Sequence, residues 1–174
     1  SKLDAAGLDL APGAQSEPGP AGESGDAEAQ ASPAHEVLQA IDRLYSVKQM
    51  PRDQQLAILV KDLSNIATYA MVDDHQYRTM KRLVPGPYCF ILPASRETPK
   101  VLLSRRKTVG VRVPAHPVAQ ALIEALGRPL ISTSASWRGE ILFDPDEIDA
   151  RFDIDLVLDG GVGGMIPSTV VSLE

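Results

Sequence analysis

The sequence predicts one α/β domain, an open sheet with helices packed against it. Short apolar runs alternate with segments of helical periodicity along most of the chain, and this alternation is typical of such a sheet. The chain has 174 residues, a length that suits a single domain. Its one cysteine, Cys89, excludes an intramolecular disulfide and fits a reducing compartment. We therefore expect a cytoplasmic, non-membrane protein whose apolar runs form the core.

Residues 1–34 differ from the remainder in composition. They are mostly Ala, Gly, Pro and Ser, without aromatic or β-branched side chains, and cannot bury enough apolar surface to offset their ordering entropy. They hold six acidic residues and one basic residue, which leaves 17 acidic and 16 basic residues for the rest of the chain. We predict a disordered tail over residues 1–34 and a folded domain over residues 35–174.

The first half of the domain begins with a helix. Ser32 and Pro33 suit the N-cap and first position of a helix that runs to about Val47. The run LAILV, residues 56–60, is short, continuous and apolar, as expected for a strand covered on both faces.

The next segments contain two helix starts and a second strand. Asp62 and Asp74 each precede a helix-like stretch and can cap it. The PGP sequence at residues 85–87 turns the chain, and YCFIL at residues 88–92 follows as a strand.

The second half continues the alternation. A helix is predicted over residues 116–127, with Pro117 in its first turn and Gly127 as its C-terminal cap. A loop, ASWRGE, and a short acidic helix, DPDEIDARF, are expected between the later strands. Four more strands are predicted from apolar runs: TVGVRVP (108–114), PLISTS (129–134), IDLVLDGG (154–161) and STVVSL (168–173).

Basic residues cluster in the middle of the chain. The segment 78–112 holds a single acid, Glu97, among nine bases, and the residues after Glu140 are dominated by acids. One side of the domain is therefore expected to attract phosphates, the alternative being an ordinary solvated charge run. The nine bases are Arg78, Lys81, Arg82, Arg96, Lys100, Arg105, Arg106, Lys107 and Arg112.

Strand periodicity gives the run TVGVRVP two distinct faces. Its three valines are predicted to face the core: Val109, Val111 and Val113. Thr108, Gly110 and Arg112 then share the opposite face, where the glycine lets a ligand approach the backbone. An arginine beside a hydroxyl suits a carboxylate or phosphate. The alternative is an arginine paired with an acid such as Asp159, or one in water.

Other motifs restrict the chemistry. The hydroxyls of STSAS, residues 132–136, follow a strand and either bind phosphate or ribose oxygens or satisfy loop backbone groups. The glycine-rich DGGVGGMIPST matches neither nucleotide-loop pattern. The histidines His35, His75 and His116 have no triad or zinc spacing, so no metal site is expected. Without an obvious nucleophile or base, binding-driven transfer on phosphate-rich substrates is favoured over hydrolysis.

Several motifs in one order resemble the YrdC family of threonylcarbamoyl-AMP synthases from about Val37 to the end. KDLSNIATYAMVDD and the KQMP and ISTS forms are most similar to its YciO branch. The motifs that carry the resemblance are KQMPRDQQLAILV, PGPYCFIL, KTVGVRVPAHPVAQALIEALGRPLISTSA, DLVLDGG and STVVSL.

The resemblance implies a twisted open mixed sheet around a basic cavity. It implies synthesis of threonylcarbamoyl-AMP and pyrophosphate from ATP with Mg²⁺, L-threonine and bicarbonate, as a step in threonylcarbamoyl-adenosine modification of tRNA. It implies no structural metal. The alternative that it implies is a YciO-like protein that binds double-stranded RNA or a nucleotide without synthase activity.

The resemblance also assigns candidate site residues, although it identifies no catalytic group. Lys48 corresponds to a lysine that meets phosphate and the carboxylated amine. Thr108 and Arg112 correspond to the pair that contacts nucleotide and the threonine carboxylate. The hydroxyls near the adenylate, threonine and phosphates correspond to Ser134, Ser136, Ser168 and Thr169. The basic approach for RNA is expected at Arg105, Arg106 and Lys107.

The sequence departs from the family pattern at three site positions: Met50 replaces an arginine, Cys89 a threonine, and Ser136 an asparagine. The family's opening Tyr-Pro-Thr-Asp strand and the segment beyond Glu174 have no counterpart, so we expect an incomplete domain that releases little pyrophosphate. A third hypothesis is a truncated, inactive product whose exposed sheet edge favours aggregation.

Overall fold

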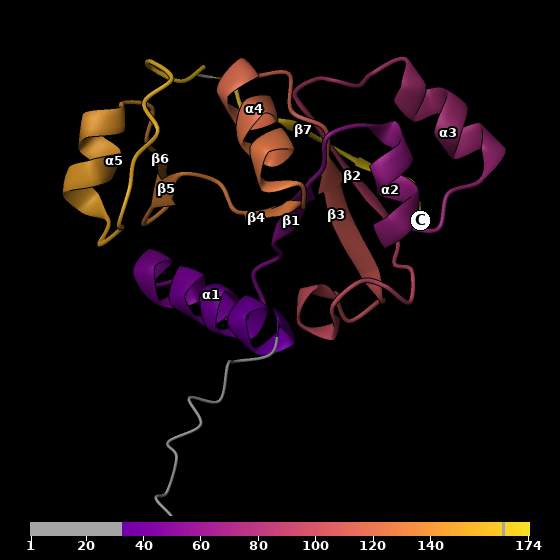
Figure 1. The fold of residues 1–174 in the computed structure, drawn as a ribbon, viewed down its shortest axis with the longest axis horizontal. Helices are drawn as coiled ribbons and strands as arrows, with labels where there is room; N and C mark the ends of the chain where they lie inside the picture. The colour runs from indigo at the N-terminus through magenta and orange to yellow at the C-terminus, as the bar shows by residue number, and fades with distance from the viewer. Residues whose placement is uncertain (1–32, 165) are drawn as a thin grey trace, which may run out of the picture. The chain divides into compact units, whose positions relative to one another are not determined.

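A computed structural model describes residues 33–164 and 166–174 of the chain (Figure 1). Apart from its last two residues, the predicted tail over residues 1–34 lies outside the described part, as does the predicted cap Ser32. The description below therefore concerns the α/β domain.

The domain is built on a mixed, open, five-stranded sheet in the order β4-β1-β3-β2-β7. The pairs β1/β3 and β2/β7 are parallel, and β1/β4 and β2/β3 are antiparallel. The expected α/β class with an open mixed sheet is confirmed. The strands are β1 (Ala57–Leu59), β2 (Tyr88–Pro93), β3 (Thr108–Arg112), β4 (Leu130–Ser132) and β7 (Thr169–Ser172).

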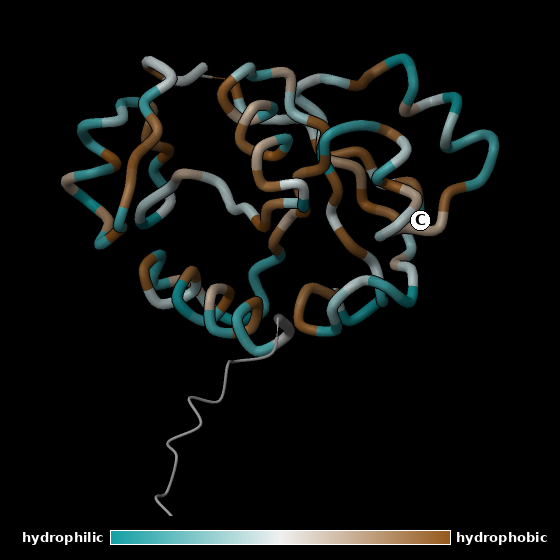
Figure 2. The backbone as a smooth tube through the Cα atoms, viewed as in Figure 1, coloured by the Kyte–Doolittle hydropathy of each residue, from teal (hydrophilic) through white to brown (hydrophobic). Residues whose placement is uncertain are grey.

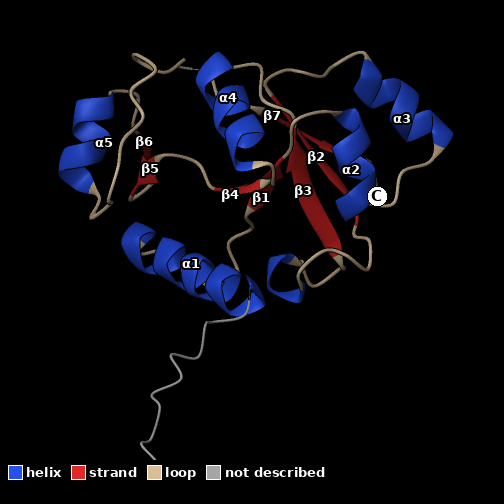
Figure 3. Ribbon diagram, viewed as in Figure 1, coloured by secondary structure: helices blue, strands red, loops and turns tan. Residues whose placement is uncertain are grey.

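Five α-helices accompany the sheet. Figure 3 shows α2 and α4 in front of the sheet, with α1 and α5 to one side. A short 3₁₀ helix, Lys100–Leu102, precedes β3. The α-helices are α1 (Pro33–Lys48), α2 (Leu63–Tyr69), α3 (Asp74–Lys81), α4 (Pro117–Leu126) and α5 (Pro145–Arg151).

Local capping explains where these helices begin and end. The Asp62 side chain accepts a hydrogen bond from the backbone of α2, as predicted. For α3 the predicted cap, Asp74, is wrong: Asp73 is the N-cap and forms a capping box with Gln76, so Asp74 is the first helical residue. Gly127 ends α4 at φ 62°, a left-handed conformation that glycine adopts without steric cost.

The core combines one face of the sheet with apolar side chains of α1, α2 and α3. The three valines predicted to face inward are all buried, at 1%, 0% and 2% exposure for Val109, Val111 and Val113. Phe90 and Ile66 are buried with them. Figure 2 shows this arrangement as brown central strands and a largely teal α3. We call this side the core face.

The opposite side, here called the site face, follows from the strand register. Gly110 of β3 lies level with Ala57 of β1 and Ile91 of β2, and Ala57 in turn pairs with Ser132 of β4. A Cβ atom placed on Gly110 would lie 3.3 Å from Cys89 Sγ, 3.5 Å from the Ile91 side chain and 3.6 Å from that of Ala57. These three side chains surround Gly110, which is buried, and the glycine itself adds no side chain to the centre of this face.

Two predictions for the second half of the chain are wrong. No strand forms over residues 154–161, and Leu156 in this stretch is 73% exposed. The predicted loop ASWRGE is instead a hairpin of β5 (Ser136–Trp137) and β6 (Glu140–Ile141). Its two turn residues, Arg138 and Gly139, have φ values of 50° and 90°, as this type of tight hairpin requires.

Candidate anion-binding site

Lys48 is placed by the way α1 ends. Gln49 follows the helix in a left-handed conformation, with φ 48°. Its N–H donates to the Ser46 carbonyl at 3.1 Å, and the Met50 N–H donates to the Tyr45 carbonyl at 3.2 Å. This pair of bonds is a Schellman motif, which terminates the helix at Lys48.

The Lys48 side chain reaches the segment that follows β4. Its Nζ donates to the Ser134 carbonyl at 2.9 Å and also to the Ser136 carbonyl. The same ammonium lies 4.8 Å from the centre of the Phe152 ring. Partial burial lowers the pKa of Lys48 from its ordinary value. The structure thus brings together Lys48, Ser134 and Ser136, with the two serines contributing backbone oxygens.

Thr108 begins β3 on the site face. It is 6% exposed, and its hydroxyl lies 2.6 Å from the Ser104 hydroxyl. Ser104 Oγ also accepts from the Thr108 N–H at 3.0 Å and the Arg106 N–H at 3.2 Å. These bonds make a closed turn that fixes the basic residues between Ser104 and Thr108.

Arg112 ends β3 on the same face. Its Nε is buried without a hydrogen-bond partner among the described residues, and its guanidinium makes no ion pair there either. Burial raises the pKa of the neighbouring Cys89 thiol, and the charge of Arg112 partly opposes that rise. The predicted alternative pairing with Asp159 does not occur. A buried donor without a partner is costly, so an anionic ligand here would satisfy it.

The register explains which predicted residues gather. Strand β4 runs antiparallel to β1, whereas β3 runs parallel to it. The last residues of β4 and the first residues of β3 therefore lie at the same end of the sheet, measured along the strands. Ser134 and Thr108 are at this end, and Arg112 lies four residues further along β3.

Ser168 and Thr169 lie at the opposite end of the sheet, measured along the strands. Thr169 begins β7, pairs with Tyr88 and donates its N–H to the Pro87 carbonyl at 2.8 Å. Because Val170 shares a face with Cys89, the side chain of Thr169 points to the other side of the sheet. The structure therefore places Ser168 nearer to Arg112 than to Thr108 and turns Thr169 away from the site face.

The predicted basic patch borders a hollow of about 590 Å³ next to Thr108. Arg105 and Lys107 are exposed and make no ion pair within the described residues, whereas Arg106 pairs with Glu174 at 3.3 Å. Arg52 and Asp53 line the hollow from the loop after α1, and Arg52 pairs with Asp42. Cations from two separate loops thus converge beside the start of β3.

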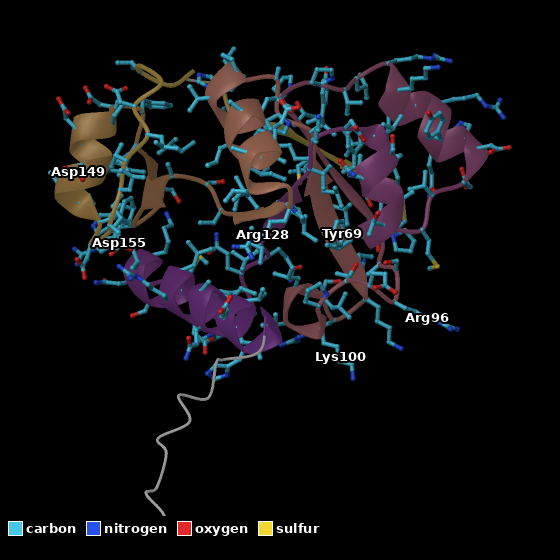
Figure 4. All side chains as sticks on the ribbon, in the orientation of Figure 1. Tyr69, Arg96, Lys100, Arg128, Asp149 and Asp155 are labelled. Carbon is cyan, nitrogen blue, oxygen red and sulfur yellow. The ribbon has the colours of Figure 1, made fainter. Side chains whose placement is uncertain are left out.

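Two of the basic and two of the acidic residues lie at different ends of the domain. Figure 4 shows Arg96 and Lys100 at one end, below the sheet, and Asp149 and Asp155 at the other end, around α5. Among residues 33–164 and 166–174, no group of His, Cys, Asp or Glu side chains is arranged to hold a metal ion. In that same part of the chain no helix has the length and apolar character needed to cross a membrane.

The chain is similar to known proteins over most of its described length. The Sua5/YciO/YrdC family, described as "Telomere recombination", matches residues 35–174. The chain belongs to this family. The predicted resemblance is therefore confirmed at the family level.

Three relatives mark its position within the family. YciO of Escherichia coli strain K12, an uncharacterized protein, is 42% identical over 139 residues, covering 77% of this chain and 68% of YciO. Its crystal structure superposes with a TM-score of 0.73, covering 78% of this chain and 68% of that one. A threonylcarbamoyl-AMP synthase of Serratia proteamaculans is 34% identical, covering 76% and 73%. The structure of P. abyssi Sua5 with L-threonine has 31% identity and a TM-score of 0.71, covering 78% of this chain and 41% of Sua5.

Four residues at the site were missed from the sequence. Ser104 and Arg52 carried a weak signal, a hydroxyl before a basic run and an arginine after the KQMP motif. Phe152 and Trp137 carried none, because Phe152 contacts Lys48 across about a hundred positions of the chain and Trp137 takes part only through its contact with Phe152.

Proposed function

We propose that the site face binds the substrates of threonylcarbamoyl-AMP synthesis. The observation that carries this proposal is the buried Nε of Arg112, which has no partner among the described residues, on the site face of a member of this family. A carboxylate or phosphate there would accept from the guanidinium in the bidentate geometry that arginine favours. The similarity to Sua5, seen with L-threonine, supports threonine as one such ligand.

The remaining groups suit a nucleotide beside it. Lys48 supplies a positive charge. The backbone and hydroxyls around Ser134 and Ser136 supply polar contacts at the same end of the sheet as Thr108. The reaction joins L-threonine, bicarbonate and Mg²⁺-bound ATP, with release of pyrophosphate and water. Holding three charged reactants together can provide much of the rate enhancement without a dedicated nucleophile.

Departures from the family pattern at the site lead us to expect slow turnover. Met50 and Cys89 replace polar or charged residues of the family pattern, and Met50 Sδ lies against the Thr133 hydroxyl at 3.8 Å. We therefore propose that the protein binds ATP and threonine but turns them over more slowly than a threonylcarbamoyl-AMP synthase. The activity would supply threonylcarbamoyl groups for tRNA modification in the cytoplasm.

Calorimetry with Arg112→Ala tests the proposal. Loss of a hydrogen bond to a charged group is expected to weaken ATP or threonine binding roughly 10–100-fold. Circular dichroism should show an unchanged fold, since the variant removes an unsatisfied donor. A pyrophosphate assay should show slow release that requires threonine and bicarbonate. Equal affinity in both proteins would remove Arg112 from the site, and absence of wild-type binding would refute the proposal.

A second candidate function is supported by the unpaired cations of the basic patch. Arg105 and Lys107 belong to the closed turn and have no acidic partner in the described chain, and Arg105 lines the hollow together with Arg52 and Asp53. We propose double-stranded RNA, tRNA included, as a ligand of this surface, in the manner of the YciO alternative. Filter binding should weaken steeply as salt rises, and Arg105→Ala with Lys107→Ala should flatten that dependence. Salt-insensitive binding would contradict this function.

A further inference from the structure

The Lys48 ammonium is directed by neutral groups only. Its two hydrogen bonds go to backbone carbonyls of Ser134 and Ser136, and its third contact is the face of the Phe152 ring. No carboxylate within the described residues forms an ion pair with it. The charge is therefore oriented by negative dipoles and a ring quadrupole but is not neutralised, so it remains available to an anion.

The Phe152 ring is itself held in place. It is 8% exposed and directly follows α5, where its N–H donates to the Ile148 carbonyl at 3.0 Å. The Trp137 ring of β5 meets it edge to face, with centroids 5.7 Å apart and an interplanar angle of 74°. This is a favoured arrangement of two aromatic rings, and the Lys48 ammonium lies over the Phe152 ring beside it.

A second cation–aromatic contact near α1 differs in one respect. Arg52 lies 4.9 Å from the Tyr45 ring, but it also pairs with the Asp42 carboxylate. Its charge is therefore compensated within the protein. Lys48 combines an aromatic platform with an uncompensated charge, which is the arrangement expected of a cation prepared for a ligand.

We propose that Phe152, braced by Trp137, is a positioning residue that holds Lys48 at the loop of Ser134–Ser136 in the substrate site. The proposal rests on the proposed function for the identity of the ligand, an ATP phosphate or the carboxylated amine of threonine. The contact geometry of Lys48 does not depend on that function. Phe152 acts through Lys48 and touches no substrate.

Amine labelling of the native protein tests the positioning directly. Acetylation at Lys48 is followed by peptide mass mapping, with exposed Lys100 as the internal reference. Phe152→Leu removes the ring face and should raise the Lys48 rate about three- to fivefold relative to Lys100. Phe152→Tyr keeps the face and should restore the wild-type rate. Phe143→Leu makes the same change elsewhere in this part of the chain and should leave the rate unaltered.

A second variant guards against misfolding of the first. Trp137→Leu leaves the Phe152 ring in place but unbraced, and should raise the Lys48 rate by a smaller factor than Phe152→Leu. ATP affinity should fall in the same order, with Phe152→Tyr and Phe143→Leu close to wild type. Wild-type rates in folded Phe152→Leu and Trp137→Leu, or an equal increase in Phe143→Leu, would overturn the proposal.

The labelling experiment separates this inference from the proposed function. ATP should protect Lys48 in the wild-type protein. If ATP gives no protection but Phe152→Leu still raises the rate, the proposed function fails and the positioning of Lys48 stands. If ATP protects and Phe152→Leu leaves the rate unchanged, the function stands and the positioning role fails.

Discussion

The two regions that contribute to the site are stabilised by different means. Thr108 and Arg112 lie on a central strand whose other face is packed into the core. Ser134, Ser136 and Phe152 belong to the segment of β5, β6 and α5, here called the lobe, residues 134–152. The lobe contacts α1 through the Lys48 hydrogen bonds and the Phe152 ring. Half of the site is therefore fixed by the main core, and the other half by a smaller set of polar, aromatic and buried contacts outside it.

The largest effect is expected in the sheet. Phe90→Ala removes a fully buried ring from the core and should lower the free energy of unfolding by about 3–5 kcal/mol. Both regions should then lose structure together. Urea denaturation followed by circular dichroism measures the change, and a loss below that of the lobe variant described next would break the comparison.

A smaller effect is expected in the lobe. Trp137→Ala removes the contact with Phe152 and the ring beneath Arg138 and Arg151, at a cost of about 1–2 kcal/mol. Limited proteolysis should cut within residues 134–152 at protease concentrations that leave the sheet intact. Simultaneous cleavage of sheet and lobe would show that the two regions unfold as one unit.

Substitutions of two glycines are expected to act on different properties, one on stability and the other on ATP affinity. Gly127→Ala introduces a side chain at a left-handed position in open space and should cost about 1 kcal/mol without affecting ATP affinity. Gly110→Ala places a methyl group 3.3 Å from the movable Cys89 thiol, so the fold should tolerate it. The methyl group fills the site face, and ATP affinity should fall roughly tenfold. Thermal melts should show the larger loss of stability in Gly127→Ala, and calorimetry the larger loss of ATP affinity in Gly110→Ala. An ATP affinity that falls equally in both variants would exclude ligand binding over Gly110.

The smallest effect on stability is expected at the exposed ion pair of Lys61 and Glu124, in which Lys61 Nζ lies 2.7 Å from Glu124 Oε1. Their hydrogen bond lowers the pKa of Glu124 and raises that of Lys61. The Glu124 contribution to stability is thus present above the ordinary carboxyl pKa and lost as pH falls through the lowered value. The Lys61 contribution is lost as pH rises through its raised pKa. Glu124→Gln should shift the melting temperature less than any variant above, because solvent screens the pair.

Local patterns predicted the buried strands and the ends of α4, where Pro117 and Gly127 stand as expected. The strand expected over residues 154–161 failed because an apolar run forms a strand only beside a partner, and pairing is a long-range property. The β5/β6 hairpin was missed because its strands have two residues each, too few for any period.

The site was likewise predictable only where local patterns determine it. Thr108 and Arg112 share a face through the strand period alone, so sequence reasoning could place them together. The contact of Lys48 with Ser134 joins residues 86 positions apart and depends on how the lobe meets α1. No local pattern could have indicated the ring of Phe152 beneath that ammonium.

The left-handed end of α1 has a consequence for Lys48. A lysine in the last turn of a helix commonly donates to that helix's own free carbonyls. Here the backbone N–H groups of Gln49 and Met50 already occupy the carbonyls of Ser46 and Tyr45. Because the helix caps itself with its own main chain, its terminal ammonium is released from that task and can connect two distant parts of the chain.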